Sequence, residues 1–138
     1  MVNIKLFFDY PKRKDGFMGR ENRRYWIIII KTGKKIRHSS VFQPHGINVN
    51  FYRIVDQRCV DVKTYEKGIE GVMLSCASGS TAVVFHLAKI KCIESPVLVR
   101  SVGGNLILNF DAAWNDVWTE GPAEILFTGN FKLDLLSK

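Results

Sequence analysis

The fold is decided by the stretch Leu74-Ser75-Cys76-Ala77-Ser78-Gly79-Ser80-Thr81-Ala82, in which a loop of small residues leads directly into an apolar run. From Ala82 to Ile90 the chain is apolar on nearly every face, so a helix formed there would be buried most of the way round. Ser78 and Ser80 are good N-cap residues. The stretch therefore predicts a central buried helix, with Cys76 just before its first turn.

The position of Cys76 bears on its chemical role. The N-terminal end of a helix carries unpaired N–H groups and a partial positive charge, which favour a thiolate and can hold a carboxylate. One interpretation is therefore a reactive thiolate working beside a bound anion. Free cysteines are also common in protein cores, so a small packed residue at a helix start is an equally good interpretation of the local pattern.

The composition indicates one ordinary globular domain. The 138 residues are 46% hydrophobic and 24% charged, and no apolar run approaches the roughly 20 residues of a membrane span. The first residues do not follow the pattern of a secretory signal peptide. Three cysteines without paired spacing argue against a disulfide framework and against a zinc site. We expect a cytoplasmic protein with reduced cysteines and no bound metal.

The positive charge is concentrated at one end. Residues 1–40 hold 11 Lys or Arg against 3 Asp or Glu, whereas the remaining residues hold 9 against 10. A basic segment can bind nucleic acid or an acidic partner. Because no recognised nucleic-acid motif accompanies the charge, we expect a solvated extension instead, and nucleic-acid binding is the less favoured alternative.

Short alternating segments on both sides of the predicted helix indicate strands. Two hairpins are expected, one from residues 46–55 and 59–65 and one from 97–102 and 105–110. Further strand candidates are residues 2–10, 25–30, 114–118 and 123–127. The predicted fold is α+β, with a curved antiparallel sheet or barrel wrapped round one central buried helix. We expect a single domain over residues 1–138, divided into a basic extension with a strand (1–24) and the main body (25–138).

Alternation along the first hairpin bears on function. It places Asn48 and Asn50 on the face opposite Ile47 and Val49. Two amides on one face can be hydrogen-bonding groups for a ligand, although asparagines on a strand surface are more often merely solvated.

Six motifs, in the same order, make the chain resemble the carboxyl-terminal lobe of diaminopimelate epimerase, a cofactor-independent amino-acid epimerase. The resemblance runs from about Phe42 to Phe131. The motifs are Gly46-Ile47-Asn48-Val49-Asn50-Phe51, Val62-Lys63-Thr64-Tyr65-Glu66-Lys67-Gly68, Leu74-Ser75-Cys76-Ala77-Ser78-Gly79, Ser95-Pro96-Val97, Gly103-Gly104-Asn105-Leu106 and Glu120-Gly121-Pro122-Ala123-Glu124.

The resemblance implies an isomerase of lysine and peptidoglycan-precursor biosynthesis that uses no cofactor. Enzymes of this family have two lobes, each a barrel round a helix, and hold the amino-acid substrate between them. One cysteine from each lobe faces the α-carbon, so that a thiolate removes the α-proton and the opposite thiol returns one. The matching catalytic residue here is Cys76. The positions that match substrate-binding residues are Asn48, Glu66, Lys67, Ala77 and Ser78.

The chain also departs from the family pattern. Nothing in it resembles the amino-terminal lobe, and the family's Asn-x-His segment falls near Arg23-Arg24-Tyr25 while its Gly-Glu-Thr falls on Gly71-Val72-Met73. Lys67 stands where the family has Arg, which loses the planar two-pronged grip on a carboxylate. Ala77 replaces a glycine where the backbone approaches the ligand closely.

These departures leave three hypotheses. Cys92 should lie on the order of 20 Å from Cys76, at the far end of the helix, and nothing places Cys59 opposite Cys76. We therefore expect catalysis only with a partner, either a separate amino-terminal lobe or a second copy with two Cys76 thiols facing across a twofold axis. The alternatives are a degenerate, non-catalytic binding or structural module, and a binder of nucleic acid or an acidic partner through the basic segment.

Overall fold

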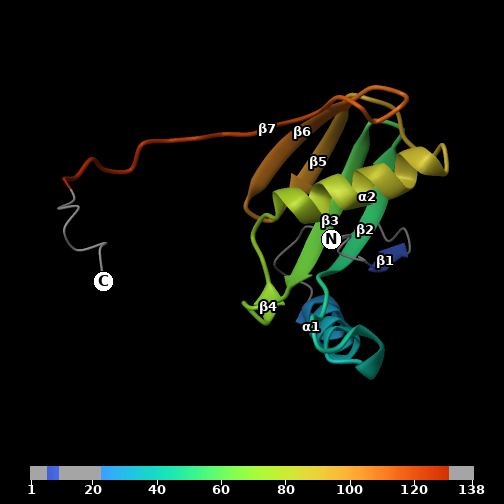
Figure 1. Ribbon diagram of the computed structural model, residues 1–138, viewed down its shortest axis with the longest axis vertical. Coiled ribbons are helices and arrows are strands. Elements are labelled where there is room, and N and C mark those ends of the chain that lie inside the picture. The colour runs from blue at the N-terminus through green and yellow to red at the C-terminus, as the bar shows by residue number, and fades with distance from the viewer. Residues whose placement is uncertain (1–5, 10–22, 131–138) are drawn as a thin grey trace.

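The computed structural model describes residues 6–9 and 23–130, and its helices lie on a seven-stranded sheet (Figure 1). The sheet order is β1-β2-β3-β5-β6-β7, with β4 beside β3. The strands are β1 (Leu6–Asp9), β2 (Val49–Asp56), β3 (Cys59–Glu66), β4 (Gly71–Val72), β5 (Val97–Ser101), β6 (Gly104–Phe110) and β7 (Val117–Glu120). The helices are α1 (Arg23–Arg37), the short 3-10 helix η1 (Ser40–Phe42) and α2 (Ala77–Lys89).

The α+β class is confirmed, and the sheet is mixed rather than antiparallel throughout. Strand β1 runs parallel to β2, and β3 runs parallel to β5, whereas the remaining pairs are antiparallel. Strands β3 and β5 are parallel because α2 lies in the connection between them and returns the chain to the same end of the sheet. The described strands do not close into a barrel, since β1 and β7 form two separate edges.

The central helix is confirmed as α2, although it begins at Ala77 rather than at Ala82. One side of α2 is buried against β2, β3, β5 and β6, and its Val83, Val84 and Leu87 are fully buried in the main core. The other side is open among the described residues, where Phe85 is 43% exposed and Ile90, which caps the helix, is 53% exposed. The sheet therefore packs along one face of α2 and does not wrap round it.

The strand predicted over residues 25–30 is wrong, because this segment belongs to α1. Ile29, Gly33 and Ile36 recur at helical spacing and lie on a second core cluster beneath the helix. Ile27, Ile28 and Ile30 are between 42% and 49% exposed, so the isoleucine run is not buried on both faces. Packing of the single apolar stripe stabilises the helix by more than the low helix propensity of the β-branched residues costs.

Gly33 lies where α1 crosses β3 most closely. A Cβ atom there would lie 2.6 Å from Cγ and 2.7 Å from Cβ of Tyr65, which is 1% exposed. We expect Gly33→Ala to lower the free energy of unfolding by about 1–2 kcal/mol, because overpacking outweighs the gain in helix propensity of up to ~1 kcal/mol. Urea denaturation measures the change, with Lys35→Ala as an exposed control on the same helix. A more stable Gly33→Ala variant would show that the helices and sheet have room at this crossing.

Both predicted hairpins are confirmed, as β2–β3 and β5–β6. Of the other strand candidates, 114–118 overlaps β7, whereas 123–127 forms no strand and runs away from the body of the protein (Figure 1). The candidate at 2–10 corresponds to β1 over residues 6–9, and its other residues lie outside the described part of the chain. Most of the basic extension lies outside it as well.

Candidate functional site

The β2–β3 hairpin carries polar side chains on the face that meets α2. Val60 and Val62 belong to the core beneath α2, so alternation puts Thr64 and Glu66 on the same face. Asn50 pairs with Thr64 across the strands and accepts a hydrogen bond from the Thr64 hydroxyl at 2.7 Å. Asn48 comes directly before β2, so its predicted place on the same face as Asn50 stays a prediction. Asn50 is fully buried, so the solvated interpretation is wrong for it.

Gly79 brings the first turn of α2 onto this hairpin. A Cβ atom at Gly79 would lie 2.6 Å from Thr64 Oγ1, 2.7 Å from Asn50 Oδ1 and 3.2 Å from Cys76 Sγ. Only a glycine permits this approach without displacing the buried pair. The start of α2, with Cys76, is therefore fixed against the strands that carry Asn50 and Thr64.

Cys76 is itself the N-cap of α2, so the prediction that it lies at the helix start is confirmed, and the capping roles predicted for Ser78 and Ser80 are wrong. Its sulfur accepts a hydrogen bond from the Gly79 N–H at 3.3 Å and lies 3.5 Å from the Ser78 hydroxyl. The side chain is only partly buried, so it can be reached from solvent.

The other two cysteines lie elsewhere and in different surroundings. Cys59 is buried on β3, and that burial raises the pKa of its thiol. The thiol of Cys92 lies 3.8 Å from the Ile90 carbonyl oxygen and can donate to it. Cys92 follows the 13 residues of α2, which separate it from Cys76 by about 20 Å. The chain thus brings one thiol to the start of α2.

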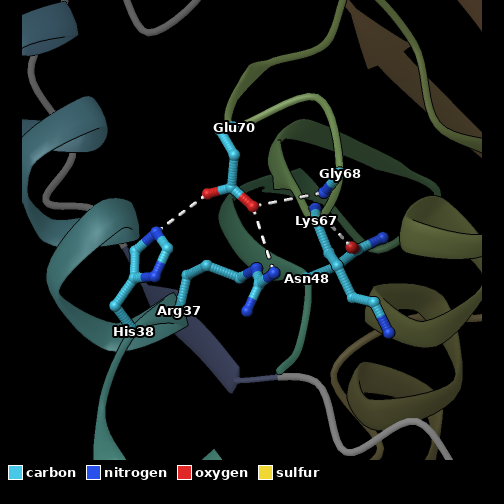
Figure 2. A network of polar contacts seen from close by, with 6 residues as sticks. All are labelled: Arg37, His38, Asn48, Lys67, Gly68 and Glu70. Carbon is cyan, nitrogen blue, oxygen red and sulfur yellow. Dashed lines mark hydrogen bonds and ion pairs between the residues drawn. The ribbon is translucent and has the colours of Figure 1, made fainter. Parts of the chain in front are cut away.

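The turn after β3 brings Lys67 to Asn48. Glu66 is the last residue of β3 and pairs with Gly71, and the backbone N–H of Lys67 donates to Asn48 Oδ1 at 2.9 Å (Figure 2). The six predicted site residues thus fall just before β2, at the end of β3 and in the turn after it, and at the start of α2. Their assignment as substrate contacts stays a prediction. These residues are Cys76, Asn48, Glu66, Lys67, Ala77 and Ser78.

A carboxylate in the same turn forms a polar network that sequence reasoning missed. Glu70 has a left-handed backbone (φ +56°), and its Oε1 accepts from the Gly68 N–H at 3.3 Å and pairs with Arg37 at 3.1 Å. Its Oε2 lies 3.0 Å from His38 Nε2 (Figure 2). Burial acts to raise the pKa of Glu70, but these three partners outweigh it and hold the pKa below its usual value. Arg37 and His38 come from the segment after the wrongly predicted strand, so no signal in the sequence joined them to Glu70.

Two further observations concern metal binding and membrane crossing by the described residues. Within 6–9 and 23–130, no group of three or more His, Cys, Asp or Glu side chains is arranged to hold a metal ion. Neither α1 nor α2 has the length and apolar character that crossing a membrane requires.

No family model matches the chain. Individual proteins do match, and among them are three named diaminopimelate epimerase. The protein of Chlorobaculum tepidum is 32% identical over 108 residues, which are 76% of this chain and 42% of the relative. That of Aquifex aeolicus is 36% identical over 113 residues (80% and 40%), and that of Methanothrix thermoacetophila is 39% identical over 103 residues (75% and 35%).

The chain is homologous to part of diaminopimelate epimerase. It spans about two fifths of the length of the first two of these relatives, as a single lobe of an epimerase would. The resemblance found from six short motifs is therefore confirmed by identity over about three quarters of the chain. The chain therefore corresponds to an epimerase-like fragment.

Proposed function

We propose that the chain is the carboxyl-terminal lobe of a diaminopimelate-epimerase-like isomerase of lysine and peptidoglycan-precursor biosynthesis. The observation that carries the proposal is Cys76, which caps α2 with its sulfur facing an N–H donor, on a helix start fixed against the β2–β3 hairpin. The 32–39% identity to named epimerases supports it. A cytoplasmic location, expected from the reduced cysteines, belongs to the same proposal.

In the proposed reaction the Cys76 thiolate takes the α-proton of the amino acid and becomes a thiol. The electron pair left on the α-carbon is delocalised into the α-carboxylate. The N–H groups of Ala77 and Ser78, at the positive end of α2, hold this carboxylate where negative charge develops. No cofactor is needed, because the only groups that move are protons.

Inversion requires a second proton donor on the opposite face of the α-carbon. Cys59 and Cys92 are placed elsewhere, so we propose that a partner supplies the second thiol. The partner is either a separate amino-terminal lobe or a second copy of this chain, related by a twofold axis that brings two Cys76 thiols together.

A non-catalytic binding module is the second candidate, and two substitutions favour it. Lys67 replaces the family's arginine and cannot form a planar two-pronged contact, and Ala77 replaces a glycine at the carboxylate-binding turn. A module of this kind has the same fold as the catalytic lobe, so only a measurement at Cys76 separates the two.

We expect alkylation by iodoacetamide at neutral pH to modify Cys76 severalfold faster than Cys59 or Cys92. Cys76 is partly exposed at the start of α2, and its sulfur accepts from the Gly79 N–H, whereas Cys59 is buried and Cys92 donates to a carbonyl. Mass spectrometry of each cysteine-containing peptide gives the three rates. Diaminopimelate should slow the reaction at Cys76 only, and pimelate, which lacks both amino groups, is the matched control ligand.

The outcomes separate the candidates. Faster reaction at Cys92 would show that the helix start does not activate Cys76. Selective reaction at Cys76 without protection by diaminopimelate would favour the non-catalytic module. Protection by diaminopimelate and not by pimelate supports the proposed amino-acid site.

A further inference from the structure

One arginine touches both chain segments that lead to the candidate site. Arg37 lies at the end of α1, and its side chain is 13% exposed. Its guanidinium packs against Gly46 at the point where any other residue would carry Cβ. The same guanidinium pairs with Glu70 Oε1 at 3.1 Å. Arg37 thus holds the segment that begins β2 and the turn that ends β3 at a fixed distance from each other.

His38 completes the attachment from the same helix end. It lies 3.0 Å from the second carboxylate oxygen of Glu70, so the two oxygens are engaged by the last residue of α1 and by the residue that follows it. Glu70 also accepts from the Gly68 N–H within the turn. A non-glycine residue adopts the left-handed conformation of Glu70 only where its surroundings hold it, and these contacts provide that restraint.

The two held segments carry site residues. Asn48 comes two residues after Gly46, and Lys67 lies within the turn, joined to Asn48 through its backbone N–H at 2.9 Å. Figure 2 shows the Glu70 side chain reaching toward α1, whereas the Lys67 side chain leaves the turn in another direction. Glu70 is therefore placed to fix the turn and not to meet a ligand beside Lys67.

We infer that Arg37, His38 and Glu70 form a positioning clamp, which sets the spacing between Asn48 and the Glu66–Lys67 pair and thereby the affinity of the Cys76 site for its ligand. The effect on ligand affinity rests on the proposed function, whereas the effect on the structure of the turn does not. All three are positioning residues, since they act through the turn. The inference gives α1 a role in the site, although it contributes no residue that faces α2.

The first arm of the test needs no ligand. In Arg37→Met, which keeps an unbranched side chain but removes the guanidinium, we expect the amide hydrogens of Lys67 and Gly68 to exchange about fivefold faster with solvent. Glu70→Gln should have the same effect, and Arg37→Lys should restore part of the protection. Exchange at Val60, near the start of β3 and fully buried in the main core, reports on global stability and should not change. Lys35→Met, which removes an exposed cation from the same helix end, is the matched control.

The second arm measures affinity through protection of Cys76 from alkylation by diaminopimelate. Arg37→Met should weaken this protection about fivefold while the alkylation rate of the free protein stays unchanged, because Cys76 is held by α2. Arg37→Lys should recover part of it, which a purely structural loss would not predict.

Two results overturn the clamp. One is unchanged exchange at Lys67 and Gly68 in both Arg37→Met and Glu70→Gln. The other is equal acceleration at Val60, which would make Arg37 a residue of global stability. If wild type is not protected by diaminopimelate, the proposed function and the affinity half of the inference fail together, and the exchange measurements still decide whether the turn is held.

Discussion

Incubated alone in D₂O, the chain is expected to leave the α-hydrogens of diaminopimelate unexchanged, although Cys76 is intact. In the proposed reaction the opposite thiol donates a proton while Cys76 removes one, so without that acid the carbanion forms slowly and exchange is slow as well as inversion. Loss of a positioned acid typically lowers the rate by about 10²- to 10⁴-fold. Lys67 and Ala77, which alter the carboxylate-binding turn, should lower it further.

Deuterium uptake at the α-carbon, followed by mass spectrometry, measures this rate, with Cys76→Ala as the control. Uptake by dilute wild-type protein that disappears in Cys76→Ala would mean that one copy suffices, against this expectation. Uptake that rises with the square of protein concentration would support a site assembled from two copies. Uptake that appears only when an amino-terminal epimerase lobe carrying its own cysteine is added would support a separate partner.

Replacing Asp61 by Asn is expected to produce the largest loss of stability. Asp61 is fully buried on β3, and one of its oxygens accepts from Arg100 Nε at 2.6 Å while the other accepts from Arg53. The two arginines come from β5 and β2, so this carboxylate joins three neighbouring strands. The hydrogen bond to Asp61 also raises the pKa of Arg100, as expected of a strong ion pair.

We expect Asp61→Asn to lower the free energy of unfolding by about 3 kcal/mol, because removing one member of a buried ion pair leaves the other charges uncompensated. The loss should be at the lower end of the usual range, since the Arg100 side chain is 37% exposed and can be rehydrated. Urea denaturation monitored by circular dichroism measures it. Asp116→Asn, at an exposed turn, should be close to neutral. Equal midpoints for the two variants would contradict a buried ionic link between the strands.

The elements that the sequence predicted correctly are those whose pattern has one explanation. The β2–β3 and β5–β6 hairpins alternate in polarity between turn residues, and α2 is too long and too apolar for a loop. In α1 the same residues suit two structures, because a run of isoleucines after Trp26 satisfies a buried strand as well as a helix. Only the partners of Ile29 and Gly33 decide between them, and those lie on β2 and β3.

The residues of the candidate site also divide into those that local spacing predicts and those that depend on tertiary contacts. Cys76 at a helix start follows from local spacing and is confirmed, whereas Asn48 lies just before β2 and not on the predicted strand. The burial of Asn50 depends on how closely Gly79 approaches it, which no local pattern contains. The contact between His38 and Glu70 joins residues 32 apart in sequence, and it requires α1 to be a helix lying beside the β3–β4 turn.

The parallel pairing of β3 with β5 has a consequence for the order of folding. The two strands are joined through α2, so they cannot form their ladder until the helix has docked and closed a loop of some thirty residues. Docking of α2 buries Val83, Val84 and Leu87 and, in the same step, seats Gly79 against Asn50 and Thr64. Cys76, at the start of α2, is therefore put in place by the slow, non-local event that completes the core, and a nascent chain acquires the arrangement of its candidate site only when it acquires its fold.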